Sequence, residues 1–316
     1  MENVERAEAV KAAEATLHEA GFKVSQRCTS RPSCFDFAAR KEDITVFLKV
    51  SPDIRDIGPN DAWGLKTISE CLSCSLLFIS DINDEKPLRD DTVYSRYGIY
   101  TITTKTFEDI VRGSLPLIEA TPGGYYVRID GNKLRERRHE LGLSIGKIAE
   151  MAGISRSSLY SYEREITRAS VSAAYRLEQI LGVPLVKTIN IFKPDPPKTE
   201  TRRLFNNFMK ARNRLLHSVI KKLSQFNLKV SIVNRAPFDF AAFCPETRLK
   251  IIGGLFKRQD KRSKMRIEEI ISLSSIIDAK PFLLSDRRIA ISHNISFIDH
   301  NEITKTSSLE ELTSLL

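Results

Sequence analysis

The sequence predicts two related α/β domains at the ends of the chain and a small all-α domain between them. The phrase FDFAA occurs twice, at Phe35–Ala39 and Phe238–Ala242, with helix and strand patterns in the same order around it. Such self-similarity indicates an internal duplication. Between the copies, residues 133–181 show apolar positions at helical spacing, interrupted by capping and turn residues. This different pattern predicts a separate helical domain.

Each copy follows the order helix, three strands, helix, strand, and then a final strand and helix. This order predicts a small mixed sheet flanked by helices. In the first copy, helices are expected at 2–20, 60–73 and 105–112, and the clearest strands at 44–50, 75–80 and 99–102. In the second copy, the expected helices are 199–226, 264–277 and 305–315, and the strands are 249–255, 281–285 and 295–298.

The middle of the chain begins at a break in the pattern. Thr121-Pro122-Gly123-Gly124 favours a turn, and residues 125–129 alternate like a short strand. After Pro184, the apolar run 185–192 predicts another strand, and residues 194–197, PDPP, predict a stiff extended linker. The predicted domains are therefore residues 1–118, 119–193 and 194–316.

Positive charge is concentrated away from the N-terminal domain. Residues 1–118 hold 15 Lys and Arg against 19 Asp and Glu, a net charge of −4. Residues 119–193 hold 12 against 8, a net of +4, and residues 194–316 hold 22 against 13, a net of +9. This distribution favours a polyanionic partner for the last two domains, although a solvated basic surface is the alternative for the last third.

The composition indicates a folded protein that does not cross a membrane. Hydrophobic residues make up 41% and charged residues 28% of the chain, and no apolar run approaches the ~20 residues of a membrane span. The acidic, helical N-terminus is unlike a secretory signal, so a cytoplasmic location is expected. Five cysteines, an odd number, argue against a disulfide framework. Cys71 and Cys74 are interpreted as small buried thiols, with zinc or a disulfide as the alternatives.

Residues 133–181 predict a helix-turn-helix. Ser144 is expected to cap a helix over 145–151, Gly153 to form the tight turn, and Ser155 to cap a second helix over 156–163. Two short helices joined in this way place the second helix in the DNA major groove. Use of the motif for protein contacts alone is the alternative.

The polar face of the second helix carries the residues expected to contact DNA. Arginine can donate two hydrogen bonds to guanine, and serine can bond to base edges or phosphates. Free amides at helix starts suit phosphate oxygens, which adds the capping serines to the predicted set. From the residues alone, the expected DNA contacts are Ser144, Ser155, Arg156, Ser157, Ser158, Tyr160, Ser161, Arg164 and Arg168.

The segment resembles the repressor-type helix-turn-helix of many phage and bacterial regulators. The resemblance implies base contacts by Arg156, Ser157 and Ser161, and a backbone contact starting at Ser144 and Ile145. The chain departs from the family at residues 164–168, where a glycine is usual after Tyr-Glu. The resemblance rests on Arg135, Arg137, Gly142-Leu143-Ser144, Ile148-Ala149, Gly153-Ile154-Ser155 and Tyr162-Glu163.

The outer domains resemble restriction-endonuclease-like and junction-resolvase domains, through Asp36 at a strand start and Lys49 on the next strand. The resemblance implies that an Asp and a Glu or Gln hold Mg²⁺, and that the Lys two residues after the Glu assists the attacking water. Here Phe47 replaces that acid, and the second copy keeps Asp239 without a matching acid or a clearly placed Lys. We therefore expect no catalytic residue and no metal site, and interpret both aspartates as capping turns or pairing with cations.

Over most of its length the chain resembles a family of archaeal helix-turn-helix transcriptional regulators. The resemblance implies a DNA-binding regulator without enzyme activity or cofactor. The expected partners are double-stranded DNA, a second copy in a homodimer and the transcription machinery, with no membrane. A nuclease or resolvase using Asp36 and Lys49 and a bridging interaction protein are the alternatives. Beyond the central module, the resemblance rests on Phe35–Arg40, Phe47–Val50, Arg96–Ile99 and Pro122–Ile129.

The basic segment 256–266 is expected to form a loop between a strand and a helix. Its cations suit flanking phosphates, with a solvated loop as the alternative. The amphipathic helix 199–226 is expected to pack in the last domain's core or against a dimer partner. The candidate phosphate contacts of the basic segment are Lys257, Arg258, Lys261 and Arg262.

Overall fold

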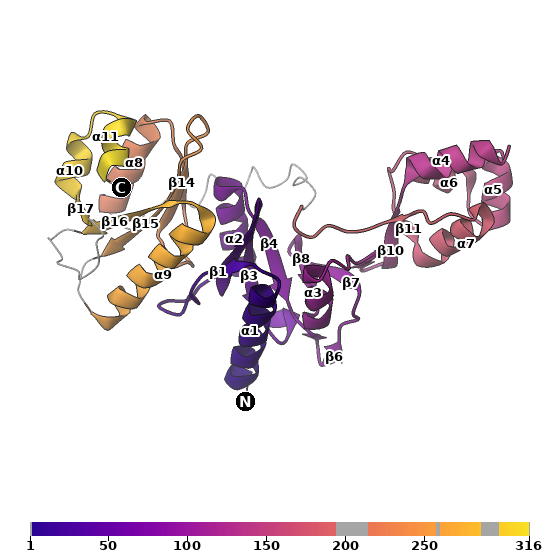
Figure 1. The fold of residues 1–316 in the computed structure, drawn as a ribbon, viewed down its shortest axis with the longest axis horizontal. Helices are drawn as coiled ribbons and strands as arrows, with labels where there is room; N and C mark the ends of the chain where they lie inside the picture. Colours follow the sequence, from indigo (N-terminus) through magenta and orange to yellow (C-terminus); the bar gives the residue numbers. More distant parts are fainter. Residues whose placement is uncertain (1, 194–213, 257–259, 286–296, 316) are drawn as a thin grey trace. The chain divides into compact units, whose positions relative to one another are not determined.

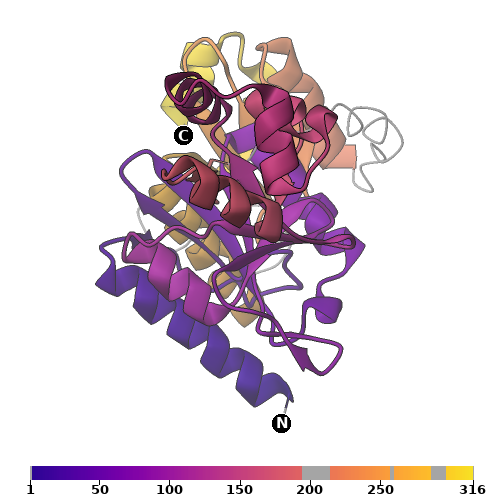
Figure 2. The same ribbon diagram turned by 90° about the vertical axis from the view of Figure 1, so that its right-hand side faces the viewer.

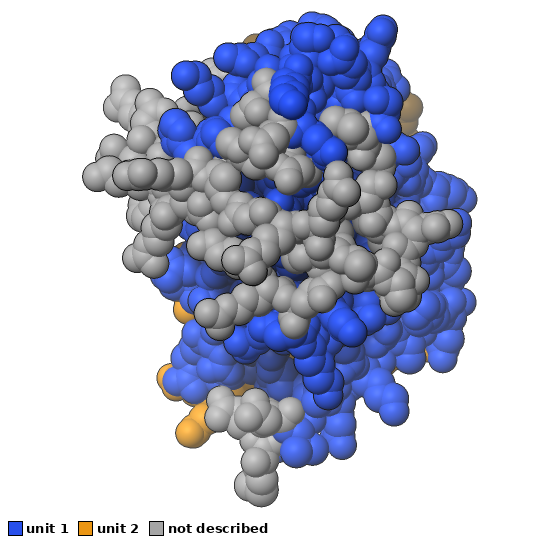
Figure 3. Space-filling model, turned by 90° about the vertical axis from the view of Figure 1, so that its left-hand side faces the viewer, with its two compact units in different colours: residues 1–78, 192–316 blue, residues 79–191 orange. Residues whose placement is uncertain are grey.

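The computed structural model describes residues 2–193, 214–256, 260–285 and 297–315. The chain forms two compact units (Figures 1 and 3). Unit 1 joins residues 1–78 to residues 192–316, and unit 2 comprises residues 79–191. The division into three domains at residues 118 and 193 stays a prediction.

The first copy of the duplicated fold lies in unit 1 as the sheet β1-β2-β3-β4. Helix α1, beside the N-terminal mark in Figure 2, packs along β1 and β3 of this sheet. The core is rich in phenylalanine, and Phe35 and Phe47 meet edge to face at 4.8 Å between ring centroids. The elements are α1 (Glu2–Glu19), β1 (Lys23–Val24), β2 (Phe37–Lys41), β3 (Ile44–Val50), the 3-10 helix Ile54–Asp56, α2 (Pro59–Leu72) and β4 (Ser75–Ile79).

The second copy, also in unit 1, is the sheet β13-β14-β15-β16-β17. The predicted helix 199–226 lies outside the described residues up to 213. Its described part, α8, places Val219 and Leu223 in the core of this sheet, as predicted. The elements are α8 (Arg214–Gln225), β13 (Lys229–Ile232), β14 (Phe240–Phe243), β15 (Lys250–Phe256), α9 (Lys261–Ile277), β16 (Lys280–Ser285), β17 (Phe297–Asp299), α10 (His300–Lys305) and α11 (Leu309–Leu315).

The strand register confirms the duplication. Phe37 pairs with Leu48 in the first copy, and Phe240 pairs with Gly253 in the second. Position 49, a lysine, therefore corresponds to Gly254. The two copies pack against each other reciprocally, because α2 lies on β13 and β14 while α9 lies on β2.

Unit 2 combines a small sheet with the helical module. Strands β8, β7, β9, β10 and β11 are neighbours in that order, and β12 also pairs with β10. The elements are β5 (Ile82–Asn83), β6 (Lys86–Pro87), β7 (Thr92–Arg96), β8 (Ile99–Ile102), α3 (Thr104–Val111), β9 (Ile118–Thr121), β10 (Gly124–Ile129), α4 (Gly131–Glu140), α5 (Ile145–Ala152), α6 (Arg156–Glu163), β11 (Ala169–Ser170), α7 (Val171–Leu181) and β12 (Val186–Lys187).

The strand predicted over residues 185–192 is wrong in extent. Only Val186 and Lys187 pair with β10, opposite Ile129 and Arg128. Strand β10 ends at Ile129, where Asp130 caps α4, so later residues have no partner on it. Ile189 instead donates its amide to the Pro116 carbonyl at 2.8 Å.

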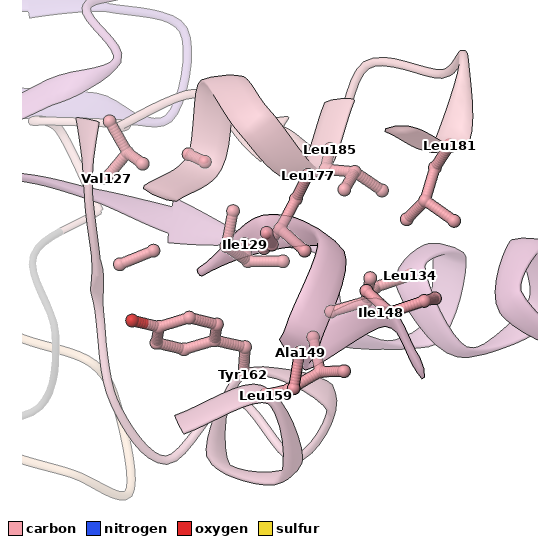
Figure 4. Packing of buried hydrophobic residues seen from close by; sticks show 13 residues of the cluster. Val127, Ile129, Leu134, Ile148, Ala149, Leu159, Tyr162, Leu177, Leu181 and Leu185 are labelled. Carbon is pink, nitrogen blue, oxygen red and sulfur yellow. The ribbon is translucent and has the colours of Figure 1, made fainter. Parts of the chain in front are cut away.

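One apolar core holds the helical module together (Figure 4). Leu134 of α4, Ile148 of α5 and Leu159 of α6 are fully buried. Val127 and Ile129 of β10 contribute to the same core, so the module rests on the sheet of unit 2. Helix α6 is thereby fixed through its apolar face, and its opposite face lies outside this core.

Gly131 is required where α4 meets the end of α6. A methyl group at this position would lie 2.4 Å from the Glu163 carbonyl oxygen. We predict that Gly131→Ala lowers the opening free energy of α6 amides, measured by hydrogen exchange, by about 1–3 kcal/mol because backbone must move.

Gly146→Ala is the matched control, because Gly146 also lies in the first turn of a helix. Its nearest neighbour is the flexible Arg156 side chain at 3.1 Å, and alanine favours helix. Equal losses in the two variants would contradict the steric explanation.

Candidate nucleic-acid interface

The predicted helix-turn-helix is confirmed in its local details. Ser144 accepts a hydrogen bond from the Lys147 amide at 3.1 Å and caps α5. Ser155 accepts from the Ser158 amide at 2.9 Å and caps α6. Gly153 lies between the helices with φ of 63°, a left-handed conformation that suits glycine.

Helix α6 separates a buried face from a polar one. Leu159 and Tyr162 point into the core, as predicted. On the other face Arg156, Ser157 and Tyr160 are exposed, while Ser158 and Ser161 are half-buried. Three polar side chains of different hydrogen-bonding capacity therefore lie on one surface in two helical turns.

Arg156 lies over the start of α5. A methyl group at Gly146 would be 3.1 Å from its Nε, so the small residue makes room for the guanidinium. The two helices border a cavity of about 470 Å³, lined by Ser144, Gly146, Lys147, Ala149, Glu150, Ile154 and Arg156. Sequence reasoning missed Gly146 and Lys147, although Lys147 stands in the first turn after a predicted cap.

Arg164 is held by Tyr160. Its Nη1 donates to the tyrosine hydroxyl at 2.8 Å, and its guanidinium carbon lies 5.1 Å from the ring centroid. Both side chains are exposed. The guanidinium therefore has a fixed direction at the end of α6 without being buried.

The turn after α6 passes through a left-handed residue. Glu165 takes the left-handed conformation, with φ of 56°, without a glycine. Its carboxylate accepts from Lys187 Nζ at 2.6 Å and from the Gly131 amide at 3.2 Å. Beyond it Arg168 pairs with the buried Glu119 at 2.5 Å, so this predicted DNA contact also joins the turn to β9.

A buried ion pair fixes the end of α6 to α4. Arg138 Nε lies 2.6 Å from Glu163 Oε1, and their side chains are 10% and 4% exposed. Arg135 adds a hydrogen bond from Nη2 to the Glu163 carbonyl at 3.0 Å. The carboxylate is therefore neutralised and bonded inside the module.

The basic segment is partly helical, so its prediction as a loop is wrong. Asp260 accepts from the Ser263 amide at 2.7 Å and starts α9 at Lys261, earlier than expected. Lys261 and Arg262 are exposed in its first turn, whereas Arg266 turns inward. Lys257 and Arg258 lie outside the described residues.

Arginine holds the aspartate of the first copy. Arg6 Nη2 lies 2.5 Å from Asp36 Oδ1, and the Val50 amide donates to Oδ2 at 2.7 Å. Lys49 is nearly buried and donates to the Ser33 carbonyl at 3.0 Å, with Asp61 3.8 Å away. The interpretation of Asp36 as a structural partner of a cation is confirmed.

The aspartate of the second copy is held by two arginines. Arg31 and Arg266 lie 2.8 and 2.6 Å from its carboxylate, and the Leu255 amide donates at 2.7 Å. Burial alone would raise the pKa of Asp239, but the two guanidinium groups outweigh it and lower the pKa below its usual range. Arg31 reaches Asp239 from the first copy, and Arg235 of the second copy pairs with Asp61 at 2.9 Å.

The cysteines are buried free thiols, as predicted for small core residues. Burial raises the pKa of Cys71 and Cys74 to about 12 each. Among the described residues no helix is long and apolar enough to span a membrane.

Comparison with known families agrees with this architecture. Residues 6–116 match the PD-(D/E)XK superfamily domain, and residues 134–187 match a helix-turn-helix model. The fold class and the central DNA-binding type of module predicted from the sequence are thereby confirmed.

Relatives align over nearly the whole chain. A protein of Methanocaldococcus jannaschii named "Putative HTH-type transcriptional regulatory protein" is 33% identical over 284 residues, which is 89% of this chain and 87% of the relative. A protein of that description from Archaeoglobus fulgidus is 31% identical over 95% of this chain and 94% of its own. Among solved structures, the restriction-modification controller protein C.AhdI from Aeromonas hydrophila is 32% identical over 17% of this chain and 80% of that chain, with a TM-score of 0.16.

These features define a DNA-binding transcriptional regulator of the helix-turn-helix class. The chain belongs to the archaeal family of HTH-type transcriptional regulatory proteins. The family resemblance seen in the sequence is confirmed.

The buried pair of Arg138 and Glu163 gives a stability prediction. Arg138→Ala leaves a buried carboxylate without its main partner, and we expect the opening free energy of α6 amides to fall by about 3–5 kcal/mol. Hydrogen exchange measures this loss. Arg112→Ala removes an exposed pair with Glu108 at 4.0 Å and should change stability by less than about 0.5 kcal/mol. A similar small change in both variants would refute the prediction.

The lowered pKa of Asp239 predicts an acid-dependent stability of unit 1. Because the folded pKa lies below the unfolded value, the stabilisation is complete above the unfolded pKa and is lost as the pH falls through the folded pKa. Asp239→Asn should flatten the decline below about pH 4. Fluorescence of Trp63, the one tryptophan of the chain, reports unfolding because it lies in α2 of this unit.

Asp278→Asn is the control for this measurement, since Asp278 is exposed and lies 3.9 Å from Arg40. Its pH profile should follow that of the parent protein. If the stability of Asp239→Asn fell in acid as that of the parent does, groups other than Asp239 would cause the loss of stability.

Proposed function

We propose that α6 enters the major groove of duplex DNA and selects sequence through Arg156, Ser157 and Ser161. The observation that carries this proposal is the exposed polar face of α6 opposite its buried Leu159 and Tyr162. Arg156 can donate to O6 and N7 of guanine, and the serines suit base edges or phosphates. Its place over Gly146 limits the directions that the guanidinium can take.

Backbone phosphates are proposed to bind around this reading face. The first amides of α5, next to Ser144 and Ile145, lack partners within the helix and suit a phosphate oxygen. Lys147 is exposed in the same turn and lines the cavity beside Arg156. We assign the remaining contacts to Ser155, Ser158, Tyr160, Arg164 and Arg168, with Lys261 and Arg262 as phosphate contacts outside unit 2.

The protein is proposed to regulate transcription as a homodimer without nuclease activity. Dimers of helix-turn-helix modules read paired half-sites about one helical turn apart. The arginines on Asp36 and Asp239 support the absence of cleavage, because each guanidinium takes carboxylate oxygens that a metal ion would need. Contact with the transcription machinery is part of this proposal.

In-vitro selection from random duplex DNA at ~150 mM salt tests the proposal, because screening there limits non-specific binding. We expect enrichment of paired half-sites. Binding without enrichment would favour a bridging role, and Mg²⁺-dependent nicking abolished by Asp36→Asn would favour a nuclease.

Arg156→Ala should cost about 1–3 kcal/mol of binding to the selected site and relax base choice at one position. Fluorescence anisotropy against the selected and single-base-changed duplexes measures both effects. Arg112→Ala, at an exposed arginine directly after α3, is the matched control and should bind like the parent. If Arg156→Ala bound every sequence as tightly as the parent does, the reading face would lie elsewhere.

A further inference from the structure

The two copies in unit 1 border an open cavity that the proposed reading helix does not use. Its volume is about 740 Å³, within the range of small-molecule sites. Both copies contribute to its wall. The lining residues are Arg6, Cys28, Thr29, Arg31, Pro32, Ser33, Asp36, Lys49, Ser51, Pro52, Asp56, Asp61, Arg235 and Arg262.

Cations outnumber carboxylates in this lining, five to three. Asp36 is already bonded to Arg6 and the Val50 amide, and Asp61 to Arg235. These acids therefore offer little to a metal ion or a cationic ligand. The excess of positive charge favours an anion.

Lys49 is a nearly buried cation of this lining with hydrogen-bond donors still unused. Its side chain is 9% exposed, and it makes one hydrogen bond, to the Ser33 carbonyl. Asp61, at 3.8 Å, is too far for a second. An ammonium group has three donors, and a buried charge is costly when they are unmet. A ligand oxygen in the cavity would satisfy them.

The second copy shows that such a cavity is not a by-product of the fold. Gly254 stands where the first copy has Lys49, and a methyl group there would lie 2.8 Å from Ile270. Arg266 covers Asp239 from its own copy. The corresponding space is thus filled in one copy and kept open, with a lysine, in the other.

The remaining lining identifies the class of ligand. Thr29, Ser33 and Ser51 bring hydroxyl groups, and the exposed Asp56 can accept hydrogen bonds from ligand hydroxyls. The described lining contains no aromatic side chain on which a base could stack. We propose that this cavity binds a small sugar or polyol phosphate, with the phosphate on Lys49, Arg235 and Arg262.

Calorimetric titration of the full chain in phosphate-free buffer tests this assignment, with ribose 5-phosphate as the probe. Inorganic phosphate, ribose and AMP are titrated in parallel. We expect ribose 5-phosphate to bind at least about tenfold more tightly than inorganic phosphate or ribose, since only it supplies both groups. Tighter binding of AMP, or no binding of any phosphate at ~10 mM, would overturn the assignment.

Variants locate the site. Lys49→Met should weaken ribose 5-phosphate binding about tenfold or more, by loss of a charge-assisted contact. Arg262→Ala, exposed at the start of α9, should also weaken it and tests the site even if Lys49→Met fails to fold. Lys264→Ala, an exposed lysine of the same helix outside the lining, should bind like the parent. Unchanged binding in Arg262→Ala, or equal loss in Lys264→Ala, would overturn the location.

Discussion

The ion pair between Arg138 and Glu163 is the interaction on which the reading helix depends. Glu163 ends α6, and its carboxylate is almost completely buried against α4. A buried charge is tolerated only with a close partner, so the position of α6 is coupled to that of Arg138. Arg135, bonded to the Glu163 carbonyl, adds a second fixed contact from the same helix. The polar face of α6 is therefore oriented by charges on its opposite side.

Arginine on a carboxylate also organises unit 1. Each copy sends an arginine from the loop before its FDFAA phrase into the other copy: Arg31 to Asp239, and Arg235 to Asp61. The acceptors are not equivalent, since Asp239 lies in its FDFAA phrase whereas Asp61 lies in α2. Asp239 also has a second arginine from its own copy. Duplication thus gave two equivalent frameworks whose charged residues have since taken different roles.

Local signals in the sequence predicted most of the helical module and the duplicated sheets. Ser144 and Ser155 cap their helices within three residues, so neighbouring letters suffice to identify them. Long-range pairs were not predictable in this way. Arg168 meets Glu119 and Arg266 meets Asp239 only after the chain has folded. The predicted length of the strand after Pro184 was wrong for a similar reason, because that length depends on where β10 ends.

The arginines that pair with Asp36 and Asp239 of the nuclease-like fold also decide which ligands that fold can bind. An arginine on Asp36 removes an anionic ligand set and leaves the nearby Lys49 without a strong acidic partner, since Asp61 is held by Arg235. The net effect is a reversal of the charge of the site, from one that would attract a metal ion to one that attracts an anion. Loss of the metal ligands therefore need not leave an inert domain. The same ion pairs that argue against cleavage leave the cavity between the copies with an excess of positive charge.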